Sequence, residues 1–103
     1  MRNYQIDSDR AGARVLIIAG IHGDEYEPMI ALDELFAGLA GKLIKGSVTG
    51  VSVANEGAYL LGTRCGQDGL DMARVCPGNP SGKPTEVIAH IVSERIKDCD
   101  FLI

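Results

Sequence analysis

Hydrophobic residues follow two different periods along the first half of this chain. An unbroken apolar run lies between Arg14 and Gly20, which is typical of a strand buried on both faces of a parallel sheet. Residues 26–40 then place hydrophobic side chains at helical spacing, with acidic residues on the other side. Residues 46–54 are rich in valine and predict the next strand.

The second half of the chain begins with a long stretch that has no clear period. Residues 55–83 are rich in glycine and predict a long loop, which in a small domain is usually functional. Pro84 opens a second predicted helix. Hydrophobic residues are expected to line the buried side of this helix: Val87, Ile88, Ile91, Val92 and Ile96. Residues 100–103 begin a further strand, and residues 4–7 predict a weak edge strand.

The order of these elements is strand, helix, strand, long loop, helix, strand. It predicts an α/β sandwich with a mostly parallel, mixed sheet flanked by helices. The 103 residues are enough for one modest domain. In such sheets ligands gather outside the carboxyl ends of the strands, so the segment after Gly20 is the first place to look for chemistry.

Composition and charge narrow the class of protein. Hydrophobic residues make up 46% of the chain, which argues against disorder. The net charge is −4 and no run of Lys or Arg occurs, so neither a nucleic acid nor a membrane is expected as a partner. The polar N-terminus lacks the apolar core of a signal peptide, and we expect a cytoplasmic protein. The three cysteines form no CxxC pair and are expected to be reduced thiols.

His22 and Glu25 follow the first predicted strand in the stretch GIHGDEYEP. An imidazole and a carboxylate at this spacing can converge on one zinc ion, and Gly23 permits the tight backbone that this requires. A catalytic zinc usually takes three protein ligands, so the pair alone is incomplete. The alternative is an ordinary polar loop in which Asp24 or Glu25 caps the following helix.

Two motifs in the chain resemble those of one enzyme family. GIHGDEYEP resembles the metal-binding GxHGxE of the succinylglutamate desuccinylase/aspartoacylase family, within the zinc carboxypeptidase superfamily. LDMARVCPG, residues 70–78, is similar to the family's Asp-Leu-Asn-Arg-x-Phe-Pro-Gly. Arg64 lies where the family carries its catalytic arginine, and residues 100–103 are similar to the strand leading into the family's Asp-Leu-His.

The resemblance implies a zinc-dependent hydrolase that cleaves an amide bond in a small-molecule N-acyl amino acid or a related carboxylate. His22 and Glu25 would be zinc ligands, Arg64 would polarise the scissile carbonyl, and Arg74 would bind a substrate carboxylate. Taken singly, each arginine also fits a solvated charge or a clamp on a carbonyl. Asp71 is expected to pair with an arginine or to cap the loop.

The chain also departs from the family pattern. Ala73 stands where the family has Asn, which alters or weakens substrate recognition. The family's third zinc ligand would fall just after Ile103, and its general base further on. His90, the other histidine, is expected to be a partly buried helix residue.

We therefore expect residues 1–103 to be a single domain, the N-terminal part of a zinc hydrolase catalytic domain. Alone it should be nearly inactive, should bind zinc weakly, and should tend to self-associate through its exposed last strand. The alternative is a non-catalytic α/β binding or assembly module that has lost the metal chemistry.

Overall fold

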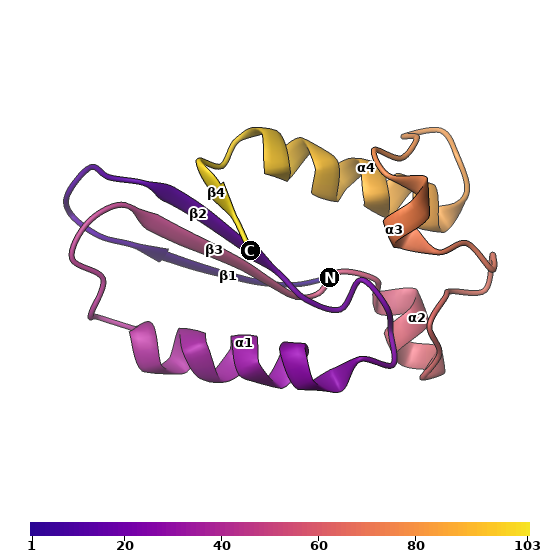
Figure 1. Cartoon of the computed structure of the whole chain (residues 1–103), viewed down its shortest axis with the longest axis horizontal. Coiled ribbons are helices and arrows are strands. Elements are labelled where there is room, and N and C mark those ends of the chain that lie inside the picture. Colours follow the sequence, from indigo (N-terminus) through magenta and orange to yellow (C-terminus); the bar gives the residue numbers. More distant parts are fainter.

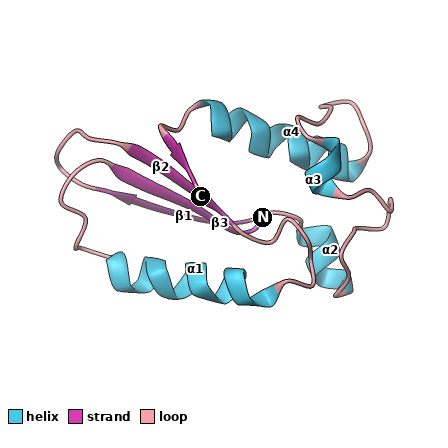
Figure 2. Cartoon of the chain, in the orientation of Figure 1, coloured by secondary structure: helices cyan, strands magenta, loops and turns pink.

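The computed structural model describes all residues from Met1 to Ile103. The strands are β1 (Arg2–Asp7), β2 (Arg14–Ile18), β3 (Ser47–Val53) and β4 (Phe101–Leu102). The helices are α1 (Tyr26–Leu39), α2 (Glu56–Leu61), α3 (Met72–Val75) and α4 (Pro84–Lys97). Figure 1 shows their arrangement along the chain, and Figure 2 separates helices from strands. None of these helices combines the length and hydrophobicity that a membrane span requires.

The four strands form one sheet in the order β1-β3-β2-β4. β2 pairs in parallel with β3 on one side and with β4 on the other, whereas β1 pairs antiparallel with β3. The mixed, mostly parallel sheet that the sequence predicts is therefore confirmed. The weak edge strand at residues 4–7 is also present, and it begins two residues earlier, at Arg2.

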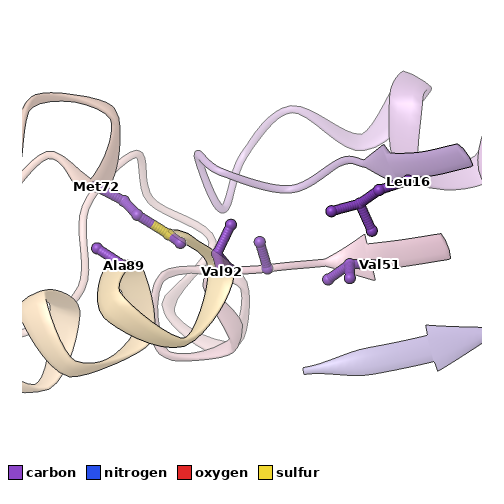
Figure 3. Close-up of a cluster of buried hydrophobic side chains, with 6 residues drawn as sticks. Leu16, Val51, Met72, Ala89 and Val92 are labelled. Carbon is purple, nitrogen blue, oxygen red and sulfur yellow. The ribbon is translucent and has the colours of Figure 1, made fainter. Parts of the chain in front are cut away.

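Helices cover both faces of the sheet, with α1 on one side and α4 on the other (Figure 1). The α1 face buries six hydrophobic residues: Ala19, Met29, Leu32, Phe36, Val48 and Val53. The α4 face buries Leu16, Val51, Ala54, Met72, Ala89 and Val92, most of which are labelled in Figure 3. Met72 lies in α3, so this second cluster ties α3 to α4 and to the sheet.

The stretch from 55 to 83 is not the continuous loop that its lack of period predicts. It contains α2 and α3, which have six and four residues. Helices this short do not display a full hydrophobic period. In the sequence they are indicated only by the residues at their N-caps. The Asn55 side chain accepts a hydrogen bond from the Ala58 amide, and the Asp71 side chain accepts one from the Ala73 amide.

The buried side of α4 agrees with the predicted one in part. The helix buries Val92 as predicted, together with Thr85 and Ala89, and Ile88 and Ile96 pack partly buried against the core. Ile91, however, is 42% exposed. The expectation that Ile91 faces the core is therefore wrong. Thr85 and Ala89 are small enough for the helix to pack closely, and a pattern of large hydrophobic residues alone does not reveal them.

Shortening Val92 is expected to cost more stability than shortening Ile91. Val92 is 2% exposed, so Val92→Ala should lower the free energy of unfolding by about 2 kcal/mol through lost burial and a residual cavity. Ile91→Ala, on the exposed side, should cost less than about 1 kcal/mol. Denaturant unfolding of the two variants checks this. An equal or larger loss for Ile91→Ala would contradict the orientation of α4.

Candidate functional site

The loop between β2 and α1 carries His22 and Glu25, and its backbone is fixed to β3. The Ala19 amide donates to the Val51 carbonyl at 2.7 Å, and the Asn55 amide donates to the Gly20 carbonyl at 2.8 Å. These bonds continue the pairing of β2 and β3 past the end of β2. Gly20 has a φ of 71°, a conformation that glycine adopts without strain, and there the chain turns towards His22.

Gly23 is needed for a close contact rather than for an unusual φ. A Cβ atom on Gly23 would lie 2.1 Å from the carbonyl carbon of Ala58, in the backbone of α2. The Gly23 amide also donates to the Arg64 carbonyl at 3.3 Å. The loop thus packs directly on α2 and on the segment that carries Arg64, which refines the expectation that Gly23 serves only a tight turn.

His22 lies between two carboxylates. Its Nδ1 is 3.0 Å from Oε1 of Glu25, and its Nε2 is 3.1 Å from Oδ1 of Asp71. The imidazole is 12% exposed. Burial alone would lower the pKa of His22, but the hydrogen bonds with Glu25 and Asp71 outweigh it, and the pKa is raised above its usual 6.5. The structure therefore places His22 and Glu25 together at the carboxyl end of β2.

Asp71 is the centre of a cluster of five charged side chains: His22, Glu25, Arg64, Asp71 and Arg74. Its Oδ2 accepts hydrogen bonds from Nε and Nη2 of Arg64 at 3.2 and 3.1 Å, and lies 3.4 Å from Nε of Arg74. Its Oδ1 also accepts from the Ala73 amide at 3.0 Å. The hydrogen bond with His22, assisted by Arg64, lowers the pKa of Asp71 to about 2 although burial opposes the shift. Both roles expected of Asp71, pairing with arginine and capping, are present.

Both arginines contact carboxylates of this group of side chains. Nη1 of Arg64 is 3.9 Å from Oε1 of Glu25, so Arg64 lies between the two carboxylates. Arg74 is 81% exposed and contacts Asp71 through Nε, which leaves the end of its guanidinium open to an anion. None of the five cavities of the chain is lined by a residue of this cluster. Its His22 and Asp71 side chains are nearly buried, whereas Glu25 and Arg64 are exposed.

The donor set fits a zinc ion in part. Nδ1 of His22 and Oε1 of Glu25 face one another, and both are ligand types that zinc accepts. The chain holds no group of three or more His, Cys, Asp or Glu side chains placed to bind a metal ion. His90 lies in α4, partly buried as expected, and makes no hydrogen bond or ion pair with the cluster.

The sequence predicted four of the five cluster residues as site residues and assigned no site role to the fifth, Asp71. Its position in the chain could have indicated such a role. Asp71 stands at the N-cap of a short helix, three residues before Arg74, and an aspartate at an N-cap has its carboxylate fixed by backbone amides. The same carboxylate also contacts His22, and this contact depends on how two loops that are distant in the sequence pack together.

Comparison with known proteins identifies the family to which this fold belongs. Residues 11–103 match the succinylglutamate desuccinylase/aspartoacylase catalytic domain. The chain belongs to this family. It is 39% identical over 79 residues to the N-alpha-acetyl-L-2,4-diaminobutyric acid deacetylase of Halomonas elongata, an alignment that covers 76% of this chain and 23% of that protein.

Solved structures of the family share the fold. A succinylglutamate desuccinylase/aspartoacylase from Rhodobacter sphaeroides is 31% identical with a TM-score of 0.89, over 97% of this chain and 31% of that one. The product-bound ectoine utilization protein EutE from Ruegeria pomeroyi is 30% identical with a TM-score of 0.87. This match covers 97% of this chain and 31% of that one. The chain therefore spans about a quarter to a third of the length of these relatives.

Proposed function

We propose that this chain carries part of the active site of a zinc-dependent hydrolase that cleaves the amide bond of an N-acyl amino acid or a similar small carboxylate. The observation that carries the proposal is the His22–Glu25 pair at the carboxyl end of β2, with Arg64 beside it. Family membership supports the reaction class. The metal is inferred from the chemistry of the two donor groups.

Each residue of the cluster has a task in this proposal. His22 and Glu25 would hold the zinc, which when bound would polarise the amide carbonyl and activate a water. Asp71 would keep the imidazole oriented through Nε2, so that Nδ1 stays directed at Glu25. Arg64, held by Asp71, would stabilise the negative charge that develops on the carbonyl oxygen.

Arg74 would bind a carboxylate of the substrate with the open end of its guanidinium. Ala73 beside it has a methyl group and cannot donate a hydrogen bond, so Arg74 would act without side-chain help from its neighbour. The class of substrate is supported by the Halomonas relative, whose name describes an acetylated diamino acid.

Residues 1–103 would form the N-terminal part of the catalytic domain. The absence of a three-ligand group from the chain and the greater length of the relatives both support this. The third ligand and the general base would then come from residues outside this chain. A non-catalytic module is the competing proposal, favoured by Ala73 and by the two-ligand site.

Zinc content and turnover distinguish the two proposals. A longer gene product that contains residues 1–103, called the longer gene product below, is expected to bind about one zinc per chain and to hydrolyse N-acetyl-2,4-diaminobutyrate or a related N-acyl amino acid. Residues 1–103 alone should bind zinc weakly. His22→Ala should remove the metal from the longer product, and His90→Ala, the matched control, should leave it in place. Full turnover without zinc would contradict the proposed zinc dependence, and the absence of both zinc and turnover would favour the module.

A further inference from the structure

Asp68 makes a set of hydrogen bonds that the proposed reaction does not use. It lies in the segment between α2 and α3, and its Oδ2 accepts from the Thr85 amide at 2.8 Å. Its Oδ1 accepts from the Thr85 hydroxyl at 2.7 Å and from the Leu70 amide at 3.2 Å. Thr85, in the first turn of α4, is 2% exposed. Asp68 thus joins an otherwise irregular segment to a buried point of the fold.

The ionised form of Asp68 is favoured at this position. Burial alone would raise its pKa, but hydrogen bonds from the Thr85 amide and hydroxyl outweigh burial and lower the pKa below its usual 3.8. A carboxylate beside the first turn of a helix is also stabilised by the helix dipole. The contact is therefore charge-assisted at neutral pH, which makes it stronger than a hydrogen bond between neutral groups.

The segment that Asp68 holds carries two members of the cluster. Arg64 precedes Asp68 by four residues and Asp71 follows it by three. Glycines flank the aspartate at 66 and 69, and they would give a free segment many backbone conformations. Two further contacts fix the segment: the Gly23 amide donates to the Arg64 carbonyl, and Met72, next to Asp71, is fully buried. Asp68 is the anchor that lies between Arg64 and Asp71.

A simple capping role for α4 does not account for the contact. The first turn of α4 already has a local partner, because the Glu86 carboxylate accepts from the Lys83 amide at 2.8 Å. Asp68 comes from a separate segment, seventeen positions earlier in the chain. Its bond to the Leu70 amide fixes the backbone that leads directly into Asp71.

We propose that Asp68 is a positioning residue, which binds Thr85 and thereby holds Asp71 and Arg64 in contact with each other. Its importance for catalysis rests on the proposed function, whereas the positioning itself is a property of this chain. The residue touches neither His22 nor Glu25, and its effect on them would pass through Asp71.

The test follows the Nε–H proton of Arg64 by NMR in the 103-residue chain. Nε donates this proton to Oδ2 of Asp71 over an N···O distance of 3.2 Å, so its exchange with water reports whether the contact persists. Asp68→Asn puts an amide NH₂ against the donor groups of Thr85, and Thr85→Val removes the hydroxyl at similar volume. Both variants are expected to speed the exchange of the Arg64 Nε proton at least about tenfold, because a charge-assisted hydrogen bond is lost.

Two control variants separate positioning from general destabilisation. Thr85→Ser keeps both the amide and a hydroxyl and should restore slow exchange. Asp100→Asn weakens a comparable clamp, in which Asp100 accepts from the Arg14 amide at 2.8 Å at the other end of β2, and should leave the Arg64 proton unchanged. Unchanged exchange in Asp68→Asn, or the same acceleration in Asp100→Asn, would overturn the proposal.

The longer gene product supplies the catalytic half of the test. There Asp68→Asn should lower kcat more than it raises KM, because Arg64 is proposed to act on the transition state. If the longer product has neither zinc nor turnover, the proposed function fails, but the Arg64 proton still decides the positioning role. If zinc and turnover are present and Asp68→Asn changes neither kcat nor the Arg64 proton, only the positioning role fails.

Discussion

Replacing Arg64 with alanine is expected to lower the kcat of the longer gene product by about 10²–10³-fold, as the loss of a donor to a developing oxyanion does. Arg64 is suited to this task because Asp71 fixes its Nε and Nη2, while Nη1 lies 3.9 Å from Oε1 of Glu25. A cation held in place beside the proposed zinc ligands can stabilise charge without reorganising during the reaction.

The measurement is steady-state hydrolysis of an N-acyl amino acid, with zinc content determined in each variant. Arg64→Lys keeps the charge but loses the planar fork, so it should recover little activity. Arg10→Ala removes an exposed arginine outside the cluster and should behave like the unmodified protein. Retention of more than about a tenth of the activity by a zinc-loaded Arg64→Ala variant would assign the oxyanion to another group.

The main elements of the fold could be predicted because their hydrophobic patterns are long enough to be specific. The apolar run in β2 indicates a buried strand, and the helical spacing in α1 indicates a helix with one buried side. The prediction of the α4 orientation was wrong at Ile91, since the helix buries its small residues and its packing is decided by the sheet. The helices α2 and α3 were not predicted, because they are shorter than the hydrophobic pattern that identifies a helix.

The site could be predicted where its residues are close in sequence. His22 and Glu25 share a loop, and their spacing after a buried strand is enough to bring them together. The contact between His22 and Asp71 joins positions 49 residues apart, and nothing in either local stretch specifies it. The Gly23 contact with α2 is of the same kind, because it depends on the distance between two backbones.

Gly23→Ala is expected to lower the free energy of unfolding by at least about 3 kcal/mol, the upper range for overpacking, because rigid backbone faces the new methyl group. The added Cβ would lie 2.1 Å from the Ala58 carbonyl carbon and 2.3 Å from the Tyr59 nitrogen. Either α2 or the His22 loop has to move. Thermal or denaturant unfolding measures the loss.

Gly38→Ala is the matched control, because a Cβ at this position of α1 meets no atom within 4 Å. Inside a helix this exchange should stabilise the chain by roughly 0.5–1 kcal/mol, since alanine loses less backbone entropy than glycine. The two variants thus add the same methyl group with opposite expected signs. Movement of the loop would also break the bond from the Gly23 amide to Arg64 and separate His22 from Asp71. Gly23→Ala as stable as the unmodified chain would mean that the loop and α2 do not pack this closely.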